Sequence, residues 1–146
     1  MRSDFTHIKV AAIALLLTAL SACGTVSKFS GPEEGVSNEA EARNVRPDDP
    51  LARPTQVGWT SARATRCGFI FNPQQLRANY LSTEAAYNSP QQMQKIKQAY
   101  DYTHESISSS INDDPTYCNK ERLDAIRADL NRYLAGDYTP SARLAR

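Results

Sequence analysis

Apolar side chains recur every three or four residues in three successive stretches of the chain, a spacing typical of amphipathic helices. The first stretch follows Asn72-Pro73, which combines an N-cap residue with a proline at the first helical position. Its stripe consists of Leu76, Tyr80, Thr83 and Tyr87, with Leu81 and Ala85 beside it. We therefore expect a helix that begins at Pro73 and buries this stripe.

The second and third stretches carry their own start and stop signals. Ser89-Pro90 precedes the clearest stripe in the chain, and Asp113-Asp114-Pro115 follows it. The inward positions of this second helix are Met93, Ile96, Tyr100, Thr103 or His104, Ile107 and Ile111. A third helix is expected from near Asn119 to just before Gly136, a residue suited to the left-handed position that ends a helix. It buries Leu123, Ile126, Leu130, Tyr133 and Leu134.

A shorter helix over Trp59–Arg66 leads into the apolar run Cys67–Phe71. That run is a candidate buried strand, but its length favours a connector packed on the bundle. No strand-like alternation competes with the helical spacing. The sequence therefore predicts an all-α fold: a small antiparallel bundle of three main helices and a short N-terminal helix, spanning residues 58–136.

The chain begins with a weakly basic segment and an apolar run, Val10–Leu20. As a helix this run would rise about 16 Å at about 1.5 Å per residue, against a hydrocarbon core of about 30 Å. It is too short to span a bilayer and suits the apolar region of a signal peptide. The alternative is an uncleaved anchor over Ile8–Val26, which would bury Ser21 and leave Cys23 without a role.

The motif Leu20-Ser21-Ala22-Cys23 resembles the lipobox of bacterial lipoproteins. The resemblance implies that residues 1–22 are a signal peptide and that Cys23 becomes the first mature residue. It also implies a diacylglyceryl group on the Cys23 sulfur and a fatty acid such as palmitate on its amino group. The residue after Cys23 is Gly24 and not aspartate, and by the same resemblance this implies sorting to the outer membrane, with the domain in the periplasm. Several acyl chains anchor a protein stably.

Residues 23–57 contain four prolines, acidic pairs and few large apolar side chains. No period lasts long enough to bury a face, so we expect the lipidated Cys23 to be followed by a disordered tether. A recognition motif around Arg46–Pro54 is the less favoured reading. The C-terminal residues 137–146 form a tail too short and polar for a core element. It either lies along the bundle through Tyr138 and Leu144 or binds a partner.

Three cysteines are present, and lipidation of Cys23 leaves Cys67 and Cys118 in a compartment that permits disulfides. We expect a bridge between them. It would close a loop of about 50 residues, worth on the order of 4 kcal/mol in the chain-entropy model. A free thiol and a metal pair are the alternatives, but a metal needs more ligands at short spacing than one mature histidine supplies.

Little in the sequence indicates catalysis, so we expect no enzyme activity, metal or cofactor. After cleavage His104 is the only histidine, on or beside an apolar stripe. Nucleophile and phosphate-binding motifs are absent from the sequence. Asp101 and Glu105 share one helix face, as the two carboxylates of a glycosidase could, but a solvated face is the favoured reading.

The net charge of +1 provides no strong field, so we expect no nucleic-acid partner. A surface for a partner or an anion could still form from Arg122, Arg127, Arg132, Tyr138 and Arg143. The favoured function is an envelope lipoprotein that acts as a structural or adaptor module and binds another envelope component. The alternative is a binding module for peptidoglycan or anionic lipopolysaccharide, and a cell-wall hydrolase is a minor third.

Overall fold

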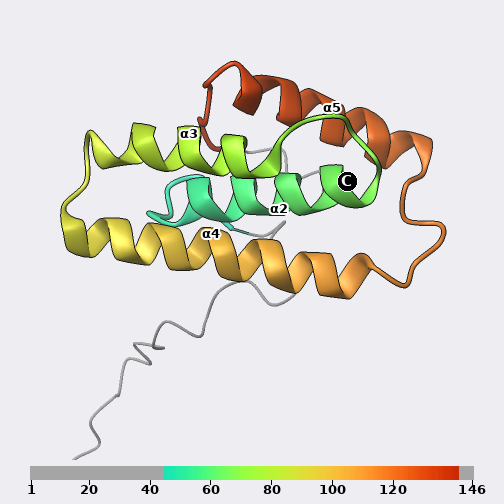
Figure 1. Ribbon diagram of the computed structural model, residues 1–146, viewed down its shortest axis with the longest axis horizontal. Helices are drawn as coiled ribbons and strands as arrows, with labels where there is room; N and C mark the ends of the chain where they lie inside the picture. Colours follow the sequence, from blue (N-terminus) through green and yellow to red (C-terminus); the bar gives the residue numbers. More distant parts are fainter. Residues whose placement is uncertain (1–44, 142–146) are drawn as a thin grey trace, which may run out of the picture.

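The computed structural model describes residues 45–141, and these form four helices with no strand among them (Figure 1). The helices are α2 (Ala52–Arg66), α3 (Pro73–Ala85), α4 (Pro90–Ile111) and α5 (Lys120–Leu134). The predicted all-α fold is confirmed. None of the helices in this part of the chain has the length and apolar character needed to cross a bilayer. The signal peptide, Cys23 and the first part of the predicted tether lie outside the described residues.

Helix α2 contacts each of the other three helices, whereas α4 and α5 do not contact each other. Figure 1 accordingly shows α4 and α5 on opposite sides, with α2 and α3 between them. The α2 and α4 helices run parallel, because Gly58 faces Tyr100 and Arg66 reaches Ile111. The other two helices run antiparallel to this pair. The bundle therefore contains two parallel pairs, α2 with α4 and α3 with α5, while the contacts between the two pairs are antiparallel as predicted.

The N-terminal helix is longer and more central than the sequence predicted. It begins at Ala52, not near Trp59, and 12 of its 15 residues are buried. The predicted extension of the disordered tether to Val57 is therefore wrong, because residues 52–57 form the first turns of this helix. Its buried positions include polar and charged side chains, among them Gln56, Ser61 and Arg63, which the sequence alone does not place in a core. Pro54 is accommodated because it lies in the first turn, where the backbone N–H has no helical partner.

Gly58 permits the close approach of α2 to α4. A Cβ atom at this position would lie 2.7 Å from the carbonyl oxygen of Tyr100 and 3.5 Å from the backbone nitrogen of His104. The first of these distances is shorter than van der Waals contact, and both atoms belong to a helical main chain that cannot move alone. Any larger residue would therefore push the parallel helices apart.

The predicted caps are present at the starts of α3, α4 and α5. The side chain of Asn72 accepts a hydrogen bond from the Gln75 amide at 2.9 Å. Ser89 and Gln92 form a reciprocal capping box. The side chain of Asn119 accepts from the Arg122 amide at 3.0 Å. Gly136 follows α5 with a φ of 83°, the left-handed conformation expected there. Local sequence signals therefore set these helix ends.

The core has two adjoining parts. One surrounds a chain of tyrosine rings on α3, α4, α5 and the tail; the other contains Trp59, Ile107, Ile111 and Tyr117. The α4 stripe is buried as predicted, apart from Met93 and His104, which are partly exposed. Three predicted inward side chains are exposed instead: Thr83, Tyr87 and Leu134. Each lies in the last turn of its helix or just beyond it, where the neighbouring helices no longer cover it.

The apolar run after α2 is a connector, and its residues have no strand pairing. Phe69 and Phe71 pack partly against the core, whereas Ile70 between them is fully exposed. The connector reading of this run is confirmed, but Ile70 contributes nothing to the core. Gly68, with a φ of 71°, turns the chain into it.

Candidate functional site

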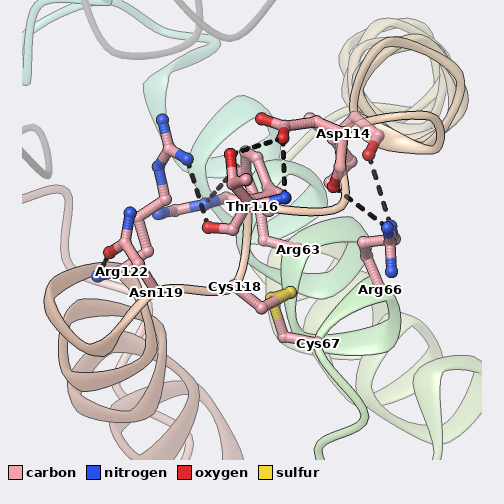
Figure 2. Close-up of a disulfide and its surroundings, with 10 residues drawn as sticks. Arg63, Arg66, Cys67, Asp114, Thr116, Cys118, Asn119 and Arg122 are labelled. Atoms are coloured by element: carbon pink, nitrogen blue, oxygen red, sulfur yellow. Dashed lines mark hydrogen bonds between the residues drawn. A yellow bond between two sulfur atoms is a disulfide. The ribbon is translucent and has the colours of Figure 1, made fainter.

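The disulfide joins the end of α2 to the loop that precedes α5 (Figure 2). Cys67 and Cys118 have Cα atoms 5.5 Å apart and are bonded with a sequence separation of 51. The predicted bridge is confirmed. Since α2 touches every other helix, the bridge ties the loop between α4 and α5 to the centre of the bundle.

Arginines surround this bridge and hold the same loop (Figure 2). The Arg66 guanidinium donates to the carbonyl oxygens of Ile111 at 3.3 Å and Asp114 at 3.1 Å. These carbonyls lie at or just beyond the C-terminus of α4, where helical partners are lacking. Arg122 donates to the carbonyl of Tyr117 at 3.1 Å. The hydrogen bonds of Thr116 and the nearby guanidinium groups of Arg122 and Arg66 lower the pKa of Asp114.

Arg63 is buried inside the second part of the core, only 1% exposed. Its guanidinium carbon lies 4.0 Å from the centroid of the Trp59 ring, a cation–π contact. Its Nε atom donates to the hydroxyl of Tyr117 at 2.7 Å. This arginine therefore stabilises the packing of α2 against the disulfide loop and is not available to an external ligand.

The three predicted anion-binding arginines of α5 do not share one face of the helix. They are spaced five residues apart, so successive side chains point about 140° apart around the axis. Arg122 binds Tyr117 as described. The i,i+3 spacing on α5 predicts ion pairs of Arg127 with Asp124 and of Arg132 with Asp129. Arg127 lies 3.3 Å from Asp124, and its guanidinium lies 5.7 Å from the Phe69 ring. The structure thus distributes these side chains over different neighbours.

Arg132 is the third of them and connects α5 to the tail. Its Nη2 atom donates to the carbonyl of Thr139 at 2.6 Å, and Nε lies 3.4 Å from a carboxylate oxygen of Asp137. Its predicted partner Asp129 lies farther away, at 3.9 Å. Arg143 lies outside the described residues. Anion binding by this set stays a prediction.

The tail residues 137–141 belong to no helix or strand, and Tyr138 is buried with 7% exposure. Its ring meets Tyr80 edge-on at 5.1 Å and stacks on Tyr133 at 6.0 Å between centroids. This burial raises the pKa of Tyr138. Tyr138 was predicted either as part of a surface for a partner or anion or as a contact of a tail that lies along the bundle. The structure shows the second arrangement at Tyr138, whose ring lies in the core.

Gln56 on α2 holds the far end of the described tail. Its side-chain nitrogen donates to the carbonyl of Ser141 at 3.1 Å, and its side-chain oxygen accepts from the Ser141 amide at 2.9 Å. Gln56 itself is only 4% exposed. We call the surface formed by Gln56, Tyr80, Arg132 and Tyr133 the tail groove. The sequence indicated neither side of this contact, because Gln56 lay in the segment predicted as tether.

A buried carboxylate lies where α2 meets the end of α3. Glu84 is 4% exposed and lies 3.2 Å from the Arg53 guanidinium. The side chain of Asn88 donates to its other carboxylate oxygen at 3.0 Å. The nearby carboxylate and the burial together raise the pKa of Tyr80, with burial as the larger cause. The ion pair of Arg53 with Glu84 was not predicted from the sequence, because both residues lie in segments without a recognisable motif.

Asp101 and His104 on α4 each contact a neighbouring side chain. Both carboxylate oxygens of Asp101 lie 2.6 Å from the guanidinium of Arg77, a bidentate clamp between α3 and α4. The ring of His104 stacks on Tyr100 at 6.3 Å, and burial lowers the pKa of His104 although Glu105 and Asp101 oppose the shift. Within residues 45–141, no group of three or more histidine, cysteine or acidic side chains could hold a metal ion.

No protein-family model, curated protein or solved structure matches this chain.

Proposed function

We propose that this protein is a lipoprotein of the bacterial envelope, anchored through lipid on Cys23, with a non-enzymatic adaptor domain that binds another envelope component. The cysteine usage carries the proposal. The chain has three cysteines, and two of them form the Cys67–Cys118 disulfide. The remaining cysteine is the one that ends the lipobox-like Leu20-Ser21-Ala22-Cys23. A disulfide also fits an oxidising compartment outside the cytoplasm.

The contacts of the charged side chains support a binding role over a hydrolytic one. Asp101, a candidate acid of a hydrolase, is held by both nitrogens of the Arg77 clamp. Glu84 is buried against Arg53. Groups paired in this way stabilise the helix contacts, and both carboxylate oxygens of Asp101 already accept from Arg77. A partner would then bind the outer surface of the domain, which the lipid at the N-terminus holds at the membrane.

The lipid anchor is tested by the intact mass of the protein isolated from fractionated membranes, native against Cys23→Ser. A triacylated native protein in the outer-membrane fraction and an unmodified variant outside it support the proposal. An unmodified native protein in the soluble periplasmic fraction would refute it. Crosslinking in cells on the same samples tests the adaptor role: one specific protein adduct that Cys23→Ser weakens supports it.

The hydrolase reading makes a different prediction with the same purified domain. A wall hydrolase would clarify a suspension of purified peptidoglycan, and Glu105→Ala would stop the clearing. We expect no clearing by either protein. Clearing by the native protein alone would replace the adaptor proposal with an enzymatic one.

A further inference from the structure

The tail groove recognises its occupant mainly through main-chain atoms. Gln56 binds both the amide and the carbonyl of Ser141, as one rung of a β-ladder would. Arg132 binds the carbonyl of Thr139. Neither contact depends on the side chain that the tail supplies at these positions. Any extended segment with free backbone groups at the same spacing could make these hydrogen bonds.

One side chain of the tail provides the specificity. Tyr138 fills the space between Tyr80 and Tyr133, and it is the only residue of 137–141 that is buried. Asp137, before it, adds an acidic group 3.4 Å from the Arg132 guanidinium. The preferred occupant is therefore an acidic residue followed by tyrosine and then three further residues, the last with both backbone groups free.

The tail covers both polar and apolar groups of the groove. If the tail left, Gln56 would exchange its two hydrogen bonds with Ser141 for hydrogen bonds with water. The tyrosine rings beneath Tyr138 would be uncovered at the same time. The tail leaves α5 at Gly136, whose φ of 83° ends the helix, and the Gly136 and Asp137 amides donate to carbonyl oxygens of the last turn.

We propose that the tail groove is a peptide-binding site in which the C-terminal tail stands in for a segment of a protein partner. The partner presents an extended segment with an acidic residue, a tyrosine and three further residues, and this segment displaces the tail. The inference rests on the proposed adaptor function and names the surface that performs it. Such an arrangement would help an adaptor, because the bound tail covers the apolar groove until a partner arrives.

The tethered tail competes at an effective concentration on the order of millimolar, so a free peptide will bind the native chain weakly. The experiment therefore loosens the tail inside the full chain. The host is the full chain with Tyr138→Ala, purified in detergent, and the probe is a fluorescein-labelled peptide of sequence DYTPSARLAR, identical to residues 137–146. We expect saturable binding, measured by fluorescence anisotropy, at least tenfold tighter than to the native chain.

Two matched changes test the contacts. A peptide with alanine in place of the tyrosine should bind at least tenfold more weakly, because it lacks the ring. Adding Gln56→Leu to the host should also weaken binding at least tenfold, because the main-chain hydrogen bonds are lost. A control host with Tyr138→Ala and Arg46→Ala should bind the peptide like the Tyr138→Ala host, since Arg46 is exposed and forms an ion pair with its neighbour Asp48. Circular dichroism monitors the helical content of each host.

Absence of saturable binding to a helical Tyr138→Ala host would overturn the proposal, as would equal binding of the alanine peptide. If that host loses its helical signal, Ser141→Pro replaces it. Proline removes the amide that Gln56 accepts from and leaves Tyr138 in place. A stable dimer of the native chain in sedimentation would assign the groove to the tail of a second copy and overturn the proposal. Lipidation of Cys23 is measured separately, so its failure is distinguishable from failure of peptide binding.

Discussion

Gly58 on α2 lies directly against the main chain of Tyr100 on α4, and a Cβ atom at Gly58 would lie 2.7 Å from the Tyr100 carbonyl oxygen. The two helices are parallel and are joined through α3, so no short loop holds them together. Their approach depends instead on the missing side chain. This contact places α2 in the centre of the bundle, where its small and polar residues are enclosed.

Gly58→Ala should destabilise the domain by about 1–3 kcal/mol, because the added methyl group forces the helical backbones apart. Alanine favours the helix more than glycine does, so a loss of stability would report the clash and not the propensity. Urea unfolding followed by circular dichroism measures the change. Ser109→Ala on the exposed side of α4 is the control and should leave the midpoint nearly unchanged. A more stable Gly58→Ala variant would contradict the close approach.

Reduction of Cys67–Cys118 should lower the melting temperature sharply. The bridge closes a loop with a sequence separation of 51, worth on the order of 4 kcal/mol in the chain-entropy model. The reduced protein should also release the loop that Arg66 and Arg122 hold. Thermal unfolding with and without reductant measures the change in melting temperature. A double variant, Cys67→Ser with Cys118→Ser, serves as the comparison. The variant should match the reduced protein and should not respond to reductant. An unchanged melting temperature on reduction would mean that the bridge adds no stability.

Arg63→Ala should destabilise the domain by about 2–4 kcal/mol, because it empties a fully buried position and removes the cation–π contact with Trp59. Trp59 is the only tryptophan, so its fluorescence reports on this contact alone. We expect a change in the emission of the folded protein together with a lower urea midpoint. Arg46→Ala, at an exposed position, should change neither. Native emission in Arg63→Ala would argue against the stacked arrangement.

The stability of the domain should fall as the pH drops below about 6.5. Burial lowers the pKa of His104 in the folded state beneath its ordinary value of 6.5. The unfolded chain therefore binds the proton first as the pH falls, and unfolding is favoured. The loss begins near pH 6.5 and ends once the pH lies below the folded pKa. Urea unfolding between pH 5 and 8 measures it, and His104→Gln should flatten this part of the profile. The same slope in both proteins would assign it to other groups.

Co-sedimentation with purified peptidoglycan separates an adaptor from a wall-binding module. The arginines of α5 are engaged with Tyr117, Asp124 and the tail, so we expect the native domain to stay in the supernatant. Replacement of Arg122, Arg127 and Arg132 by glutamine should then change nothing in this assay. Sedimentation of the native domain that the triple variant abolishes would instead favour the peptidoglycan-binding alternative.

The termini of α3, α4 and α5 could be predicted because the signals that set them are local. Asn72, Ser89 and Asn119 accept hydrogen bonds from amides three residues later, within the reach of a single turn. The disulfide could be predicted for a different reason, since cysteine chemistry leaves few choices once one of three cysteines is assigned elsewhere. The helical spacing of apolar residues, with no strand-like alternation, also excluded a fold built from strands.

The first half of α2 and the tail could not be predicted in the same way. Residues 52–57 carry a proline and few large apolar side chains, which is typical of a linker when nothing is known of its neighbours. Gln56 is buried only because the tail covers it, and Tyr138 is buried only because α3 and α5 both contribute a ring.

The sequence alone determined the helical class, three of the four helix starts and the pairing of Cys67 with Cys118, because each depends on neighbouring residues or on a short list of partners. Only the tertiary structure decided which helix occupies the centre and what the tail covers. Those outcomes depend on contacts between residues far apart in the chain. Helix α2 buries polar and charged side chains such as Gln56 and Arg63, whose hydrogen-bond partners lie far away in the chain, so neighbouring residues do not indicate that it is central.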